Sequence, residues 1–325
     1  MHALVDPAIL FFVFGAFAGL VKSNLEIPPA IARFLSLYLL MALGLKGGFA
    51  LAQSGLTSQV AVGLSLAVFL AMLVPLLSYY WLRRFLNGFD AAALSATYGS
   101  VSAVTFITAM NHLETQGLAY GGHMAAAMAL MESPAIIFAV LMANRLRHQN
   151  ATQPQTPAAS RISMGKVLHE SFTDGAQLLL LGAMLIGMVS GEAGRQAMQP
   201  FSGDLFKGML AFFLLDMGLM AARNLPGLRG QSWWLMAYGV LAPLVHASIA
   251  LVLCWWLAVP LADAVLLMVL AASASYIAVP AVLRYALPEA NPSLYVGLSL
   301  GLTFPFNILL GIPLYTRVAT GVLGG

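Results

Sequence analysis

Long runs of uncharged, apolar residues limit this chain to one broad fold class. The run Ala91 to Met110 covers 20 residues without a charge, and an α-helix needs about 20 apolar residues to cross a bilayer. Of the 325 residues, 60% are hydrophobic and 8% are charged, whereas soluble domains carry about 25% charged residues. Membrane β-strands would instead alternate in polarity over about 10 residues. The sequence therefore predicts an all-α polytopic membrane protein.

Hydropathy divides the chain into ten predicted transmembrane helices, and we expect the fourth and ninth to be discontinuous. Between the fifth and sixth spans, Asn144 to Glu170 is rich in Pro, Gln, Ser and Thr, which predicts a flexible cytoplasmic linker. That linker is either a plain tether or a docking site for a regulator. The predicted domains are residues 1–143, the linker 144–170, and residues 171–325. The ten spans are Pro7–Val21, Ile27–Leu51, Val60–Leu82, Ala91–Met110, Gly121–Ala143, Phe172–Ser190, Leu205–Ala222, Trp233–Leu257, Ala264–Leu287 and Pro292–Val318.

The two halves of the chain resemble each other at four landmarks. The matched positions lie between 168 and 174 residues apart, and they are Gly44 and Gly218, Pro75 and Pro243, Asp90 and Asp263, and Pro134 and Pro305. Because five spans is an odd number, the second half must enter the membrane from the opposite side. The sequence thus predicts two inverted five-helix repeats, as in many secondary transporters, with substrate bound where the repeats meet.

The basic residues predict the orientation in the membrane. With the N-terminus outside, four basic residues face the exterior: Lys46, Arg195, Lys207 and Arg317. The other eleven fall in cytoplasmic loops or their flanks, in agreement with the positive-inside rule. We therefore expect a multi-pass protein of a bacterial inner (plasma) membrane with both termini outside. Since the basic residues lie in short loops, the net charge of +3 does not indicate a nucleic-acid partner.

The fourth span is unusually polar for a membrane helix. Six hydroxyl side chains surround Gly99, at Ser95, Thr97, Ser100, Ser102, Thr105 and Thr108. Hydroxyls in membrane helices often bond the carbonyl four residues back or a neighbouring helix, which would explain any one of them. The cluster instead favours a helix break near Gly99. Freed N–H groups and the positive end of a half-helix would then attract an anion.

The ninth span carries a second candidate break. Ser273, Ser275 and Tyr276 precede Pro280, and a proline removes a donor and crowds the carbonyl four residues back. An ordinary proline kink is the alternative. The match to the fourth span favours a substrate site made by both breaks.

Charged residues inside spans are functional candidates because an unpaired one is costly in lipid. Glu132 and Asp216 are each a candidate cation ligand or proton carrier, or else a helix-pairing hydrogen bonder. Lys46 lies near a span end, where its side chain can snorkel, and we expect His246 to bond a neighbouring helix. Cys254, the only cysteine, is expected to be a small buried hydrophobe. Because no transition-metal ligand set, phosphate loop or nucleophile elbow occurs, the sequence does not predict an enzyme.

The chain resembles the sodium-dependent bicarbonate transporter family of the SbtA type over nearly its whole length. The similarity lies in LEIPPAIARFLSLYLLMALGLKGGFAL, YGSVSAVT, MESPAIIFAVLMAN, LAPLVHASIAL, AASASYIAVP, LPEANPSLYVG and IPLYTRVATGVLGG. The resemblance implies ten spans in an inverted repeat with core and gate domains, a trimer, and uptake of bicarbonate with sodium.

The resemblance also implies which residues bind the substrate and the coupling ion. It assigns the anion to Gly99, Ser100, Ser102, Thr105, Ser273, Ser275 and Tyr276. It assigns the cation to Glu132, Ser102 and Ser275. No other cofactor is expected.

Two segments depart from the family pattern. The first break usually reads close to VSGST, whereas this chain has VSAVT; the second reads close to SSSD, whereas this chain has SASY, ending in Tyr276. The missing aspartate would be a natural sodium ligand, and a neutral phenol cannot replace its charge. Either Glu132 carries more of the cation binding, or the coupling or the anion differs.

These observations predict a secondary active transporter for a small anion, with sodium-dependent bicarbonate uptake as the leading function. One alternative is a proton- or sodium-coupled carrier for another small carboxylate. The other is a membrane scaffold or sensor that transports nothing, in which the hydroxyls merely hold helices together.

Overall fold

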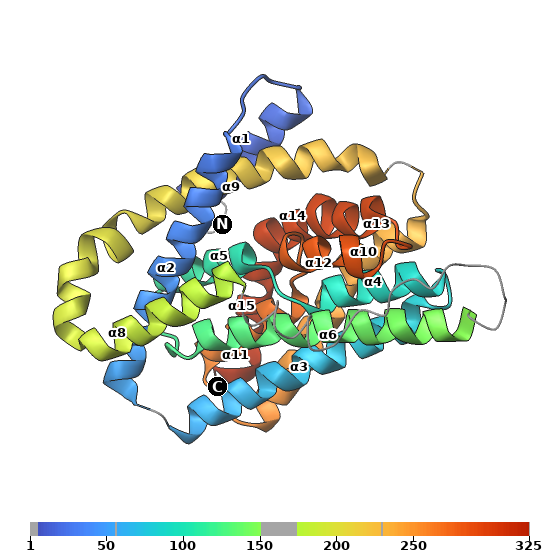
Figure 1. Ribbon diagram of the computed structural model, residues 1–325. Coiled ribbons are helices and arrows are strands. Elements are labelled where there is room, and N and C mark those ends of the chain that lie inside the picture. The colour runs from blue at the N-terminus through green and yellow to red at the C-terminus, as the bar shows by residue number, and fades with distance from the viewer. Residues whose placement is uncertain (1–5, 56, 151–173, 229, 325) are drawn as a thin grey trace.

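The computed structural model describes residues 6–55, 57–150, 174–228 and 230–324, and these ranges fold into helices joined by short loops (Figure 1). Within them, seven helical segments are long and apolar enough to cross a membrane, and the helices Pro7–Leu20 and Leu261–Ala272 are shorter but apolar. One of the seven segments, Gly175–Leu228, includes the seventh predicted span and residues 175–190 of the sixth. The predicted class, a polytopic helical membrane protein, is confirmed.

The helices follow the predicted spans closely. The first half contains α1 Pro7–Leu20, α2 Pro29–Ser54, α3 Ser58–Leu82, α4 Gly88–Gly99, α5 Ala103–Thr115 and α6 Met124–Asn150. The second half contains α8 Gly175–Gln199, η2 Pro200–Asp204, α9 Phe206–Asn224, η3 Leu225–Leu228, α10 Trp233–Trp256, α11 Leu261–Ala272, α12 Ala278–Ala286, α13 Pro292–Leu298, η4 Ser299–Thr303, α14 Phe304–Phe306, η5 Asn307–Gly311 and α15 Ile312–Leu323.

Several helices begin at polar caps that the sequence supplies. Asp6 accepts a hydrogen bond from the Ala8 amide at 2.8 Å to start α1, and Asn87 accepts one from the Asp90 amide at 2.9 Å to start α4. Such side chains satisfy first-turn N–H groups that have no partner within the helix. Apolar periodicity and caps together set the ends of these spans.

The first residues of the predicted linker are helical. Helix α6 continues to Asn150, because residues 144–150 contain no proline or glycine to end it. Arg147 also ties this end of α6 to the loop before α13, donating to Glu289 at 2.8 Å. The rest of the predicted linker, residues 151–170, lies outside the described residues.

The last predicted span is not one regular helix. Two wide π-helical turns, η4 and η5, flank the three-residue helix α14. Pro305 and Pro313 each remove a backbone donor in this stretch, and wide turns of this kind often occur at functional sites. They bring Asn307 to the end of α11, where its Nδ2 donates to the Ala272 carbonyl at 2.9 Å.

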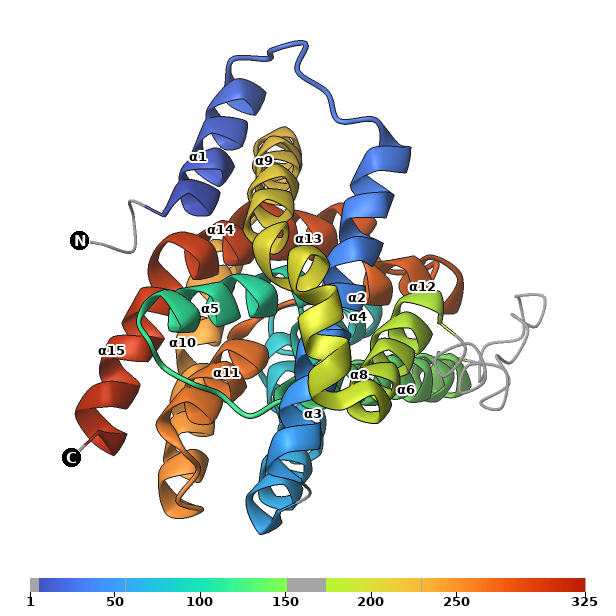
Figure 2. The same ribbon diagram turned by 90° about the vertical axis from the view of Figure 1, so that its left-hand side faces the viewer.

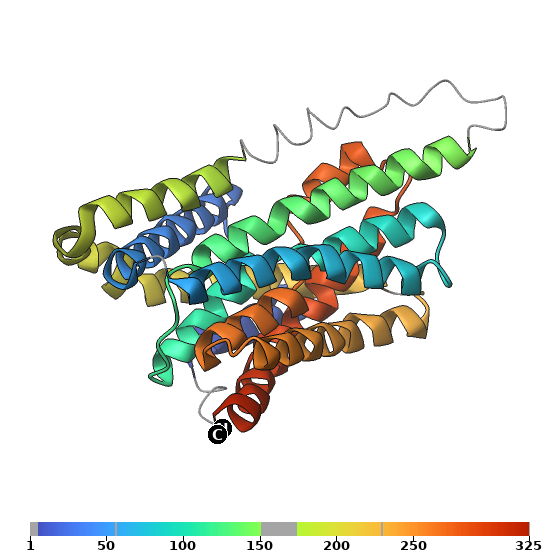
Figure 3. The same cartoon turned by 90° about the horizontal axis from the view of Figure 1, so that it is seen from below.

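Helices α1, α2, α8 and α9 form two closely packed pairs. Helix α1 packs along α9 (Figure 2), and α2 packs along α8 (Figures 2 and 3). Glycines allow both close approaches: a Cβ at Gly44 would strike the Leu180 carbonyl of α8, and one at Gly218 would strike the Phe12 carbonyl of α1. Small residues at such contacts are typical of membrane helix pairs.

Helices α4 and α11 form the innermost part of the protein. Every residue of Ala91–Gly99 in α4 and of Ala262–Ala272 in α11 is buried. Helices α3 and α6 pack against α4, while α10 and α15 pack against α11. This arrangement places the ends of α4 and α11, where both spans are interrupted, in the protein interior.

Candidate functional site

The fourth span is broken between Gly99 and Ala103. Ser100 is extended, with φ −95° and ψ 177°, and Ser102 caps α5 by accepting from the Thr105 amide at 3.2 Å. Gly99 ends α4, and a Cβ there would lie 2.6 Å from the Pro75 ring of α3. The predicted break near Gly99 is confirmed, and the glycine itself serves helix packing.

The ninth span is broken between Ala272 and Ala278. Ser273 is extended, with φ −79° and ψ 165°, and the Ser275 hydroxyl accepts from the Val279 amide at 3.2 Å. Pro280 is the third residue of α12, where a proline fits the start of a helix. The chain is already non-helical before this proline, so the feature is a break and not an ordinary kink.

The two breaks contact each other directly. The Ser102 amide donates to the Ser273 hydroxyl at 3.0 Å, and the Ser275 amide donates to the Thr97 carbonyl at 2.8 Å. Ser273 in turn donates to the Leu270 carbonyl at 2.9 Å. These bonds hold the start of α5 and the start of α12 at one place.

A pocket of about 100 Å³ lies at this meeting point. One water needs roughly 10–15 Å³ on this measure, so the pocket has room for a small anion and an ion or a few waters. Its polar lining comes from Ser36, Ser102, Glu132, Gln177, Ser275 and Tyr276. Of the predicted site residues, the structure thus gathers Ser102, Ser275, Tyr276 and Glu132 in one pocket.

Glu132 reaches the pocket from α6 and is held by a residue that the sequence reasoning missed. Gln177 of α8 donates to Glu132 Oε2 at 2.9 Å. Asp174 caps α8 by accepting from the Ala176 and Gln177 amides, which fixes the helix turn that carries Gln177. An amide inside an apolar run, as in GAQLLLLG, is the signal that could have identified it.

Tyr276 is one of the pocket-lining residues, and its hydroxyl lies beside Met217 of α9. The hydroxyl lies 3.6 Å from Met217 Sδ, and the ring packs against Phe304 with centroids 5.1 Å apart. The residue is buried, with 7% of its surface exposed. Because Tyr276 has no carboxylate, the acidic group in the described lining of this pocket comes from Glu132.

Four other predicted site residues do not line the pocket. Gly99 packs on α3, as described above, and Ser273 bonds the Ser102 amide. Thr105 donates to the Ser102 hydroxyl at 2.9 Å. Ser100 Oγ is buried and, within the described part of the chain, has no hydrogen-bond partner. Ser273 and Thr105 therefore stabilise the breaks through their bonds to Ser102, and Gly99 does so through packing.

The remaining polar candidates lie elsewhere. His246 Nε2 is 3.4 Å from Ser78 Oγ of α3, so the predicted interhelical contact is confirmed. Cys254 is buried, as predicted. Asp216 is buried in α9, and its Oδ2 has no partner among the described residues. Lys46 forms an ion pair with Glu114 at 3.1 Å instead of extending freely to the membrane surface.

Comparison with known proteins identifies the family. The model of the Na⁺-dependent bicarbonate transporter superfamily matches residues 7–320. A search of curated proteins found no match. The family match covers both breaks, all four polar pocket residues that the sequence predicted, and nearly the whole chain. This protein therefore belongs to the Na⁺-dependent bicarbonate transporter superfamily.

Proposed function

We propose that this protein is a secondary active transporter that takes up bicarbonate together with sodium through the pocket between the two breaks. The observation that carries the proposal is that two helix starts, those of α5 and α12, open onto one pocket. First-turn N–H groups lack partners within a helix, and the helix dipole adds positive charge there. Such helix starts favour an anion.

In this proposal the anion lies between Ser102 and Ser275. Both serines line the pocket, and so do the first residues of both helices, Ala103 and Ala278. Amide and hydroxyl donors suit the oxygens of a small planar oxyanion. The larger predicted set also contains Gly99, Ser100, Thr105 and Ser273, which do not line the pocket. Of these, Thr105 and Ser273 would position Ser102 through their hydrogen bonds to it.

The coupling ion is proposed to lie beside Glu132. Sodium is a hard cation that prefers oxygen ligands and negative charge, and Glu132 supplies both at the pocket wall. Ser102 and Ser275 are the proposed neutral ligands. Because a tyrosine is uncharged near neutral pH, Tyr276 cannot be the negatively charged ligand of sodium, and Glu132 is proposed in its place. Sodium would offset the repulsion between the entering anion and this carboxylate.

We further propose that residues 1–143 and 171–325 are inverted five-helix repeats. Two helix pairs support this, because the inverted symmetry would map the α1–α9 pair onto the α2–α8 pair. The matched glycines occupy corresponding contacts: Gly218 lies against α1, and Gly44 lies against α8. Ser78 and His246, which touch, hold corresponding places after the matched prolines. The four paired helices would form a gate, and transport would alternate access by moving the core against it.

The setting of the proposed transporter follows from the sequence and the family. We propose a bacterial inner membrane, both termini outside, and a homo-oligomer, with a trimer as the expected form. The ligands are bicarbonate or a similar small anion and sodium, and the protein is not proposed to act as an enzyme.

Uptake of labelled bicarbonate into proteoliposomes tests the function. We expect uptake that rises with an inward sodium gradient and is lost without sodium. Uptake that ignores sodium would overturn the coupling, and absence of uptake would overturn the substrate.

A second candidate is a proton-coupled carrier of another small carboxylate. It is favoured by Glu132, whose hydrogen-bond partner is the neutral amide of Gln177, so that the carboxyl is free to exchange a proton. Glu132→Gln separates the two functions. Loss of pH dependence with retained sodium dependence would favour the proton role.

A further inference from the structure

A second, larger pocket lies beside the candidate site. It measures about 270 Å³ and is walled by α2, by the end of α8 with η2, and by the α5–α6 connection. Its charged lining residues are Lys46, Glu114 and Arg195. The proposed transport mechanism leaves all three without a role.

The two pockets follow consecutive turns of the same helices. On α2, Leu40 lines the candidate site and Leu43 lines the second pocket. On α6, Met128 lines the candidate site and Ala125 lines the second pocket. Three residues are less than one helical turn, so a single layer of side chains separates the two spaces. The larger pocket is therefore positioned as an antechamber to the smaller one.

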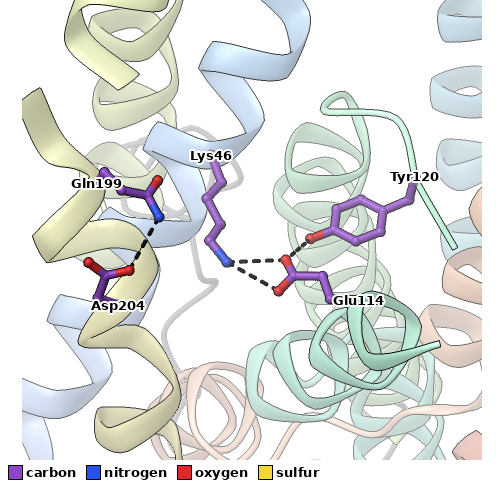
Figure 4. Close-up of polar contacts among 5 residues, drawn as sticks. All are labelled: Lys46, Glu114, Tyr120, Gln199 and Asp204. Carbon is purple, nitrogen blue, oxygen red and sulfur yellow. Dashed lines mark hydrogen bonds and ion pairs between the residues drawn. The ribbon is translucent and has the colours of Figure 1, made fainter. Parts of the chain in front are cut away.

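One carboxylate in the antechamber is held by two donors (Figure 4). Lys46 Nζ lies 3.1 Å from Glu114 Oε1 and 3.5 Å from Oε2. The Tyr120 hydroxyl donates to the same Oε1 at 2.6 Å. The ammonium also lies 4.2 Å from the centroid of the Phe206 ring, a cation–π contact that holds it in place.

Arg195 and Asp204, two other charged residues near this pocket, also have hydrogen-bond partners. Arg195 donates to both oxygens of Glu192 at 2.7 and 2.8 Å. On η2, Asp204 accepts from Gln199 at 3.4 Å (Figure 4). The Lys46–Glu114 pair is partly exposed, with 23% and 31% of the side-chain surfaces accessible. An exposed ion pair is weak, worth about 0–1 kcal/mol, so Glu114 can leave Lys46 at little cost.

Tyr120 remains a donor when Glu114 leaves. Burial, together with the charge and hydrogen bond of Glu114, raises the pKa of Tyr120. Its hydroxyl is therefore protonated throughout the neutral range. Lys46 and Tyr120 then offer an ammonium and a hydroxyl spaced to hold one carboxylate group.

We propose that this antechamber is a second anion-binding station, in which Lys46 and Tyr120 bind a small planar oxyanion in the place of the Glu114 carboxylate. A carboxylate and a bicarbonate ion share the planar group with two outer oxygens that these donors now hold. Glu114 acts as an internal competitor, which keeps the station closed until an anion arrives. The inference rests on the proposed anion transport, which it deepens by naming the step before the anion reaches the two breaks.

The test uses the rate at which charged reagents modify a cysteine inside the antechamber. Gln53 lines the pocket and lies two helical turns from Lys46 on α2, about 10 Å along the axis. A Gln53→Cys variant, the pocket reporter, is treated with an anionic and a cationic thiosulfonate in detergent at low ionic strength. The native Cys254 is buried and gives little background. An Asn24→Cys variant, altered in the loop between α1 and α2, is the control reporter.

The ratio of the anionic to the cationic rate reports the local charge. Removing one unit charge at about 10 Å should change this ratio roughly fourfold in water. We expect Lys46→Gln to lower the ratio in the pocket reporter and Glu114→Gln to raise it, with no change in the control reporter. Glu114→Gln tests the pair from its other side, so the result does not depend on whether Lys46→Gln folds. A ratio unchanged by either variant overturns the proposal.

Bicarbonate then tests the station itself. We expect added bicarbonate to slow the anionic reagent in the pocket reporter, more strongly when Glu114→Gln is present and not at all with Lys46→Gln. Equal slowing in all backgrounds, or none, overturns the station. The thiol reaction needs no transport, so its outcome is independent of the uptake assay. If the rates depend on charge but no uptake occurs, only the proposed transport function is contradicted. If uptake occurs but the rates do not depend on charge, only the proposed second anion-binding station is contradicted.

Discussion

The two helix breaks share a plan and differ in how they end. Each begins with an extended serine after an inner helix, Ser100 after α4 and Ser273 after α11. Each has a second serine, two residues on, whose hydroxyl caps the next turn. The first break then enters α5 at once, whereas the second continues through Tyr276 and Ile277 before α12. The shared serines support the proposed anion site, and the differing ends support the proposal that the cation lies beside Glu132.

The ends differ because of one side chain and one cap. In the first break Ser102 is itself the N-cap of α5. In the second break the N-cap position of α12 is Ile277, which makes no side-chain cap, and Tyr276 points its hydroxyl toward Met217. The start of α12 therefore relies on Ser275, two residues before the N-cap position, for its side-chain hydrogen bond, and residues 273–277 of this break include no acid. Negative charge comes from Glu132, on a third helix.

Removing the charge of Glu132 should have the largest effect. Glu132→Gln keeps the shape and the contact with Gln177 but deletes the carboxylate that the proposal gives to sodium. Hard cations bind more weakly when a charged oxygen ligand becomes a neutral one, so the sodium concentration for half-maximal uptake should rise by roughly tenfold or more, about 1.4 kcal/mol. Glu289→Gln, at the exposed partner of Arg147, is the matched control and should leave sodium dependence unchanged. If Glu132→Gln shows the same sodium dependence as the Glu289→Gln control, the cation does not bind at Glu132.

Removing the capping hydroxyls should have the next largest effect and compares the two breaks directly. Losing one hydrogen bond to a ligand costs about 1 kcal/mol, so Ser102→Ala and Ser275→Ala should each weaken bicarbonate binding roughly fivefold. Ser102→Ala should also lower the melting temperature more, because Ser102 serves both the amide and the hydroxyl of Thr105. Ser248→Ala, whose exposed hydroxyl bonds its own helix, is the control. Unchanged bicarbonate binding in both site variants would favour the scaffold alternative.

Adding an acid to the second break should produce a smaller gain. Tyr276→Asp makes the two carboxylates of the pocket neighbours of one cation, so sodium dependence should shift several-fold to lower concentration. The measurement is uptake against sodium concentration, with Tyr276→Asn as the uncharged control. A shift of the same size in both variants would show that space, and not charge, matters at this position.

Removing only the tyrosine hydroxyl should have the smallest effect. Tyr276→Phe deletes a bond to a thioether sulfur, which is a weak acceptor, and retains the packing on Phe304. Uptake and sodium dependence should stay within about twofold of wild type. A large loss would mean that the hydroxyl turns to the substrate during transport.

Much of the fold could be predicted from the sequence, because apolar runs and caps act locally. The ten spans and both breaks follow from hydropathy and from serine-rich interruptions. The helical start of the linker and the π turns near Pro305 could not be predicted in this way, because tertiary contacts of Arg147 and Asn307 accompany them.

The site could be predicted only in part. Hydroxyl types pointed to the breaks, but which hydroxyls face the pocket depends on how the two breaks bond each other. Gln177 lies 45 residues from Glu132, and Glu114 lies 68 residues from Lys46. Pairings over such separations depend on how α8 and α5 pack beside their partners, which no local pattern in the sequence specifies.

A structure determined with bicarbonate and sodium bound tests the central claim most directly. The account predicts anion density between Ser102 and Ser275, at the starts of α5 and α12, with the cation beside Glu132. An empty pocket there, with the bound anion and cation at other places in the protein, would contradict it.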